Sequence, residues 1–123
     1  MQILIVEDNF QMRRMIRGLV TPWASAVFEA AGGAEAFTSY HEHRPDWVLM
    51  DISLSEGDGI EATRRICAAD AQAQVVMVTG FDDDALRAAA KEAGACGYVM
   101  KENLLELRGL LSSPPAKHQL TSQ

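Results

Sequence analysis

The sequence predicts an α/β protein with a doubly wound sheet of five parallel strands. Four short, nearly continuous apolar runs are centred on Leu4, Leu49, Val76 and Val99. Runs that are continuous rather than alternating are typical of strands buried on both faces, as in parallel sheets. A weaker fifth run covers 26–30, and segments long enough for helices separate the runs. Because strand and helix alternate along the chain, right-handed crossovers are expected to place helices on both faces of the sheet.

The helices are expected where apolar residues recur at helical spacing. Asn9 is the expected N-cap of the first helix, and its apolar stripe consists of Met12, Met15, Ile16, Leu19 and Val20. Further helices are expected over 34–43, 59–69, 82–93 and 102–111. The predicted domain therefore covers residues 1–111. The polar segment 112–123 is expected to be a disordered tail or a linker stub.

The composition is that of one globular domain, with 123 residues of which 48% are hydrophobic and 23% are charged. Eleven basic and 17 acidic residues give a formal net charge of −6, which disfavours binding to nucleic acid or to an anionic membrane surface. The N-terminus lacks the basic start of a signal peptide. Cys67 and Cys96 have no metal-type spacing and are interpreted as buried, reduced thiols. Together these features predict a cytoplasmic protein.

Polar side chains follow the predicted strands at their carboxyl ends. Glu7 and Asp8 follow the first strand, Asp51 the third, Thr79 the fourth and Lys101 the fifth. Because α/β proteins place their chemistry at the carboxyl edge of the sheet, we expect these side chains to converge there. Such a set suits a divalent metal ion beside a carboxylate that accepts a chemical group.

The acidic residues predict a magnesium site. Mg²⁺ prefers octahedral oxygen coordination, keeps several water molecules and binds through one or two carboxylates plus phosphate oxygens. Asp8 and Asp51 can supply the carboxylates, Glu7 can hold a coordinated water, and the backbone carbonyl of Ser53 can complete the site. Carboxylates packed together without a cation repel one another, so the cluster implies a metal ion or raised pKa values.

Each of these residues also has a simpler interpretation. An acid pair at a strand end is commonly solvated loop charge, and Lys101 can be an ordinary surface lysine. Thr79 can close a turn with Gly80, and Tyr98 can be a packed core aromatic. The acids and the lysine occur together at successive strand ends, and this combination favours the functional interpretation.

Five segments of the sequence resemble the receiver domain of two-component response regulators, in the order and spacing of that family: 3–9, 45–52, 58–64, 76–79 and 94–101. The resemblance implies a flavodoxin-like (βα)5 fold with strand order 2-1-3-4-5. It implies that Asp51 is the phosphoacceptor and that Glu7 and Asp8 help to bind Mg²⁺, for which Mn²⁺ can substitute. Thr79 and Lys101 would then contact the phosphoryl oxygens.

The resemblance also implies a signalling switch rather than an enzyme, with only self-catalysed phosphoryl transfer and dephosphorylation. The expected phosphoryl donor is a sensor histidine kinase or a phosphotransfer protein. Phosphorylation is expected to draw Thr79 inward and to let Tyr98 fill the vacated space. The surface of the last two helices and the last strand would change, and there a partner or a second copy of the chain is expected to bind.

Three alternatives are open at this point. A phosphatase of the haloacid dehalogenase type also uses an aspartyl phosphate, Mg²⁺ and a lysine, but its nucleophile follows the first strand and precedes a second Asp by two residues. The chain has Glu7-Asp8-Asn9-Phe10 there. A flavodoxin-like cofactor-binding protein would have Ser, Thr and Gly in its first loop instead of two acids. A receiver-like scaffold that works without phosphorylation usually lacks one or more of the site residues.

Overall fold

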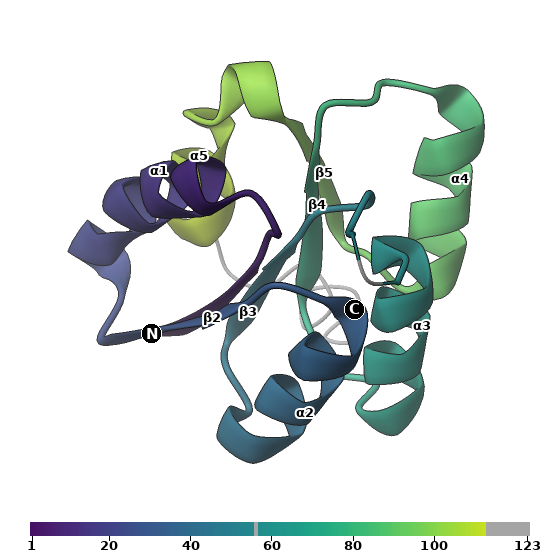
Figure 1. Ribbon diagram of the computed structural model, residues 1–123, viewed down its shortest axis with the longest axis horizontal. Coiled ribbons are helices and arrows are strands. Elements are labelled where there is room, and N and C mark those ends of the chain that lie inside the picture. The colour runs from purple at the N-terminus through teal and green to yellow at the C-terminus, as the bar shows by residue number, and fades with distance from the viewer. Residues whose placement is uncertain (56, 113–123) are drawn as a thin grey trace, which may run out of the picture.

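A single parallel sheet of five strands forms the centre of the protein (Figure 1). The computed structural model describes residues 1–55 and 57–112. The strand order is β2-β1-β3-β4-β5 and each neighbouring pair is parallel, which confirms the predicted fold class. The strands are β1 (Gln2–Val6), β2 (Ala26–Ala30), β3 (Trp47–Met50), β4 (Val75–Thr79) and β5 (Gly97–Met100).

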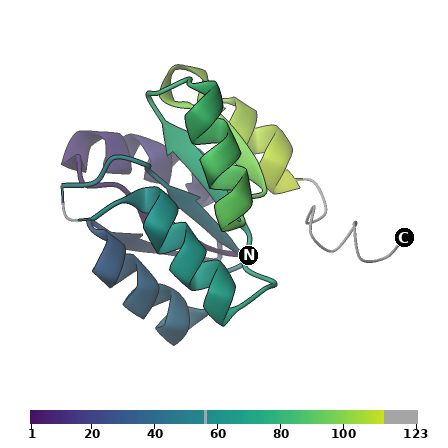
Figure 2. The ribbon, with the colours of Figure 1, turned by 90° about the vertical axis from the view of Figure 1, so that its right-hand side faces the viewer.

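Helices cover both faces of this sheet (Figures 1 and 2). One face carries α1 (Phe10–Val20) and α5 (Glu106–Ser112). The other face carries α2 (Gly33–His43), α3 (Gly59–Ala69) and α4 (Asp84–Ala93). Two short 3-10 helices, η1 (Thr21–Trp23) and η2 (Lys101–Asn103), follow α1 and β5. No helix in the described ranges is long and apolar enough to cross a lipid bilayer.

The hydrophobic core is divided into two clusters by the sheet, because successive residues of a strand point to opposite faces. In β4, Val75 and Met77 pack with residues of α2, α3 and α4. Val76 and Val78 of the same strand pack with residues of α1 and α5. The strands are thus buried on both faces, which explains their continuous apolar sequences.

The N-cap predicted for α1 is confirmed, whereas the predicted apolar stripe is wrong at one position. Asn9 Oδ1 accepts a hydrogen bond of 2.8 Å from the backbone N–H of Met12. Ile16 and Val20 are buried. Met15, however, is 56% exposed, because the helix turns its side chain away from the sheet.

The last predicted helix begins later than expected. Residues 101–103 form η2, and α5 begins only at Glu106. Leu104, Leu107 and Leu111 are nevertheless buried, as their spacing predicts. Ser112, which the prediction assigns to the tail, lies in α5; the rest of that segment, 113–123, lies outside the described residues.

The two cysteines are partly exposed, so the prediction that both are buried is wrong. Cys67 of α3 packs at the margin of one core cluster, and Cys96 packs at the margin of the other. The exposure of each cysteine depends on where α3 and the loop before β5 place it relative to the core. The hydropathy of the sequence alone does not predict that exposure.

Candidate functional site

Three acidic residues meet at the carboxyl edge of β1 and β3. Glu7 and Asp51 extend the sheet by one residue, because Glu7 N–H donates to the Ala30 carbonyl and Asp51 N–H donates to the Val6 carbonyl, each at 3.0 Å. Strand alternation turns both side chains toward the face covered by α1 and α5. Asp8 follows Glu7 at the start of the loop into α1.

The acids form a compact cluster of oxygen ligands. One carboxylate oxygen each from Glu7, Asp8 and Asp51 lie within 4.8 Å of one another. Glu7 is only 1% exposed and Asp51 only 4%. Charged oxygen ligands at this density match the preference of Mg²⁺ and Mn²⁺ for hard donors, so the residues fit a divalent cation.

Lys101 adds a positive charge to the cluster. Its Nζ lies 2.8 Å from Glu7 Oε1 and 3.1 Å from Asp51 Oδ2. Burial alone would lower the pKa of Lys101, but its hydrogen bonds with Glu7 and Asp51 outweigh that effect and raise the pKa. The ammonium group is therefore held in the charged form beside both carboxylates.

The two adjacent acids, Glu7 and Asp8, have opposite pKa shifts. Burial raises the pKa of Glu7, and the negative charge of Asp51 adds to this effect, while Lys101 and the Asn9 N–H oppose it. Burial also acts to raise the pKa of Asp8, but hydrogen bonds with Glu7 and Ser55 prevail and lower it. The Ser55 N–H donates to Asp8 Oδ2 at 2.9 Å. The buried member of the pair is thus harder to ionise than a solvated glutamate, whereas the more exposed member ionises more easily than a solvated aspartate.

Residues that the sequence did not identify hold the loop of the acid pair in place. Arg13 of α1 donates from Nη1 to the Glu7 carbonyl at 2.7 Å. Its Nε donates at 2.7 Å to Glu29 of β2, which also accepts from Arg17. The sequence contains no local signal for this network, because its members lie in three parts of the chain: the loop after β1, α1 and β2.

The loop between β3 and α3 is shaped by close backbone contacts at Asp51. A Cβ atom on Gly59 would lie 1.9 Å from the Asp51 carbonyl oxygen, so this position requires glycine. Asp58 caps α3 by accepting from the Ile60 N–H at 2.7 Å. Gly57 has a φ of 93°, a left-handed conformation that favours glycine. Ser53, predicted to offer its carbonyl to the metal, is exposed and pairs with Asp58 in an isolated antiparallel bridge.

Thr79 and Tyr98 approach the edge from the opposite face of the sheet. Thr79 is the last residue of β4 and is fully buried, and its Oγ1 accepts a hydrogen bond of 3.3 Å from the Phe81 N–H. Tyr98 of β5 packs against the core cluster of α2, α3 and α4 and donates from its hydroxyl to the Phe81 carbonyl at 2.5 Å. Both predicted switch residues thus contact the same residue, Phe81, in the loop between β4 and α4.

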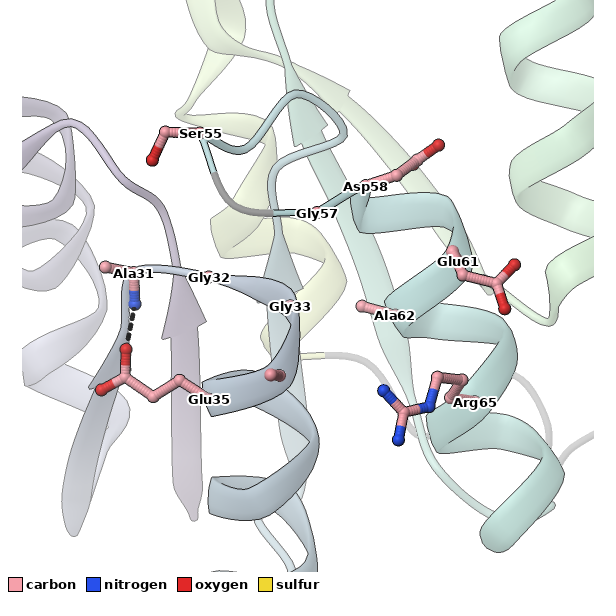
Figure 3. Close-up of a pocket in the computed structure, with 11 residues that line it drawn as sticks. Ala31, Gly32, Gly33, Glu35, Ser55, Gly57, Asp58, Glu61, Ala62 and Arg65 are labelled. Carbon is pink, nitrogen blue, oxygen red and sulfur yellow. Dashed lines mark hydrogen bonds between the residues drawn. The ribbon is translucent and has the colours of Figure 1, made fainter.

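A cavity of about 530 Å³ lies beside the acidic cluster, between the start of α2 and the start of α3 (Figure 3). Figure 3 shows Glu35 accepting from the Ala31 N–H on one wall and Arg65 on the other. The guanidinium carbon of Arg65 lies 4.6 Å from the centroid of the Phe37 ring. Ser55 is the link between the cavity and the site, because it lines the cavity and also contacts Asp8. The acids and Lys101 do not line this cavity.

Comparisons with known proteins agree with this geometry. Residues 3–111 match the response regulator receiver domain. The chemotaxis protein CheY of Bacillus subtilis (strain 168) is 42% identical over 101 residues, which are 81% of this chain and 84% of that protein. The transcriptional regulatory protein LnrK of the same organism is 36% identical over 103 residues, which are 82% of this chain but 47% of that protein. A crystal structure of a LuxR-family two-component response regulator from Aurantimonas sp. SI85-9A1 superimposes with a TM-score of 0.81 at 33% identity, covering 93% of this chain and 86% of that one.

The chain therefore belongs to the response regulator receiver domain family of two-component signalling. Receiver domains are switches controlled by phosphorylation, and this function, rather than that of a haloacid dehalogenase phosphatase or a flavodoxin-like cofactor-binding protein, applies to the chain. The acidic cluster of Glu7, Asp8 and Asp51 fits that function.

Proposed function

We propose that Asp51 is the carboxylate that accepts the phosphoryl group. The observation that carries this assignment is the contact of 3.1 Å between Lys101 Nζ and Asp51 Oδ2, within the cluster of three acids. The backbone of Asp51 is also held in place on both sides. Its N–H continues the hydrogen-bond ladder between β1 and β3, and its carbonyl packs on Gly59. A fixed nucleophile beside neutralising charge is what phosphoryl transfer requires of a protein.

The proposed reaction transfers a phosphoryl group from a phosphohistidine of a kinase or phosphotransfer protein. A carboxylate oxygen of Asp51 forms a bond to phosphorus while the bond from phosphorus to the donor's imidazole nitrogen breaks. The electron pair of the broken bond remains on the imidazole, which then takes a proton from solvent. The product is an aspartyl phosphate, and attack by water returns Asp51 and inorganic phosphate. The chain itself supplies the catalysis in both steps.

Each residue near Asp51 has a role in this proposal. Asp8 and Asp51 would hold Mg²⁺ or Mn²⁺ directly, Glu7 would hold it through a water molecule, and Ser53 would hold it through its backbone carbonyl. When bound there, the cation would supply positive charge to neutralise the phosphoryl oxygens. Lys101 pairs with a phosphoryl oxygen, and the Thr79 hydroxyl donates to another.

The proposed switch acts through Thr79 and Tyr98. Because both side chains contact Phe81, a shift of Thr79 toward the phosphoryl group changes the hydrogen bond that holds Tyr98. The affected surface consists of α4, β5 and α5, and there a partner or a second copy of the chain binds. This part of the proposal rests on the contacts of Phe81 with both residues.

Labelling with acetyl phosphate and Mg²⁺, followed by intact mass measurement, tests the proposal. Wild type and Asp46→Asn should gain one phosphoryl group, and Asp51→Asn should gain none. Asp46 is a matched control because it flanks the other end of β3 and is exposed. Chelation of the metal should abolish labelling. If wild type stays unlabelled with Mg²⁺ and a cognate kinase, the chain acts as a scaffold without phosphorylation.

A further inference from the structure

Arg87 of α4 lies over Tyr98, outside the residues assigned to phosphoryl chemistry. Its guanidinium carbon is 4.3 Å from the centroid of the Tyr98 ring, which is within the range of a cation–π contact. Its Nε also donates to Asp82 Oδ1 at 2.8 Å. Asp82 stands in the loop between β4 and α4, so Arg87 joins that loop to β5.

Tyr98 is consequently held at two points. Its ring lies beneath Arg87, and its hydroxyl donates to the Phe81 carbonyl at 2.5 Å. The N–H of Phe81 in turn donates to Thr79 Oγ1 at 3.3 Å. As an acceptor in this bond, the Thr79 hydroxyl keeps its own proton available for donation to a phosphoryl oxygen.

The geometry points to Arg87 as a positioning residue that clamps Tyr98 against the β4–α4 loop and thereby orients the Thr79 hydroxyl for phosphorylation. This inference rests on the proposed function of Asp51 and Thr79. Among the described residues, Arg87 contacts Asp82 and Tyr98 and makes no such contact with Glu7, Asp8, Asp51 or Lys101. Burial raises the pKa of Tyr98 although the Arg87 charge opposes this, so the phenol remains a donor near neutral pH.

The strength of the clamp sets the expected effect. The Arg87 side chain is 42% exposed, so its cation–π contact is of the surface type. Loss of such a contact should disfavour the clamped arrangement about two- to fivefold. Phosphorylation by acetyl phosphate should slow by at most the same factor, because the fraction of molecules with Thr79 oriented falls by no more than the equilibrium constant does.

Tyrosine NMR tests the clamp on the unphosphorylated protein. The chain has two tyrosines, and Tyr40 serves as an internal reference because it is buried and bonded to Asp70. Arg87→Gln should shift or broaden the ring resonances of Tyr98 and leave those of Tyr40 unchanged. Arg64→Gln is the matched control, because Arg64 is an exposed helical arginine paired with Glu61. Unchanged Tyr98 resonances in Arg87→Gln would overturn the inference.

Rates of acetyl phosphate labelling test the coupling to Thr79. Arg87→Gln should label more slowly than wild type and Arg64→Gln, by at most about fivefold. In a Tyr98→Leu background the Arg87 substitution should have no further effect, because the ring that it holds is gone. The positioning role would be overturned if the Arg87 substitution slowed labelling equally in the Tyr98→Leu background. A wild-type labelling rate in Arg87→Gln would overturn it as well. Absence of labelling in wild type would instead overturn the proposed function, so the two failures are distinguishable.

Discussion

Gly59 lies so close to Asp51 that a single added methyl group would collide with the Asp51 carbonyl oxygen at 1.9 Å. The first residue of α3 therefore sets the position of the acidic residue at the end of β3. This contact links the stability of the loop to the geometry of the proposed phosphoacceptor.

Gly59→Ala should both destabilise the protein and reduce phosphoryl labelling of Asp51. The clash is with backbone, which cannot move aside cheaply, so the free energy of unfolding should fall by about 1–3 kcal/mol or more. Urea denaturation measures the first effect and intact mass after acetyl phosphate the second. Gly18→Ala is the control, because a Cβ there would meet nothing within 4 Å apart from its chain neighbours and its own helix backbone, and alanine favours the helix. Normal labelling of Gly59→Ala would show that phosphoryl transfer to Asp51 tolerates the backbone movement that the added methyl group causes.

Asp8→Asn should weaken Mg²⁺ binding. The amide retains an oxygen that can accept from the Ser55 N–H but removes one of the negative charges in the cluster. Affinity should fall on the order of tenfold to a hundredfold, measured by isothermal titration of Mg²⁺. Asp46→Asn, at the other end of β3, should bind Mg²⁺ like wild type. Equal affinity in both variants would place the metal elsewhere.

Lys101→Met should make the protein more dependent on Mg²⁺ for stability. Without Lys101 the buried carboxylates of Glu7 and Asp51 lose a counter-charge, so unfolding without metal should become easier by about 1–3 kcal/mol. Mg²⁺ should restore more stability in the variant than it adds to wild type, because it replaces the missing positive charge. Thermal unfolding at several Mg²⁺ concentrations measures this. A smaller Mg²⁺ effect in the variant would contradict the prediction.

A second ionisable network, away from the site, should set part of the acid stability. Tyr40 donates to Asp70 Oδ2 at 2.7 Å and Arg44 donates to the same oxygen at 3.0 Å. The Tyr40 hydrogen bond is the largest cause that lowers the pKa of Asp70 below its ordinary value of 3.8. The stabilisation is thus complete above pH 3.8 and is lost as the pH falls through the lower pKa of the folded protein.

Tyr40→Phe should therefore reduce the free energy of unfolding by about 1 kcal/mol at neutral pH. The difference from wild type should narrow in acid, where Asp70 is protonated in both the folded and the unfolded protein. Urea denaturation as a function of pH measures both trends. If the difference in the free energy of unfolding between Tyr40→Phe and wild type stays constant in acid, the substitution removes packing contacts rather than the hydrogen bond to the charged Asp70.

Much of the fold follows from the sequence because parallel strands have a simple signature. Continuous apolar runs identified the strands, and the polar residue after each run predicted which side chains meet at the carboxyl edge. Glu7, Asp51 and Lys101 do meet there, because strand alternation turns all three toward the face of α1 and α5. The strand order β2-β1-β3-β4-β5 is predicted by the family resemblance alone. The apolar pattern of the sequence identifies the strands but does not indicate which of them are neighbours.

The remaining features depend on tertiary contacts that no local pattern encodes. Met15 has the spacing of a buried residue but lies on the outer side of α1. The contact of Arg13 with the Glu7 carbonyl and that of Arg87 with the Tyr98 ring join residues from different elements. Side chains as long as arginine can reach many partners, so only the folded chain selects one.

Chemical trapping of the labelled residue tests the central claim most directly. Borohydride reduces an aspartyl phosphate to homoserine, which tandem mass spectrometry locates in the sequence. After incubation with acetyl phosphate and Mg²⁺, we predict homoserine at position 51 and unmodified Glu7 and Asp8. Homoserine at position 8, or a label that borohydride does not trap at any aspartate, would contradict the assignment of Asp51 as the phosphoacceptor.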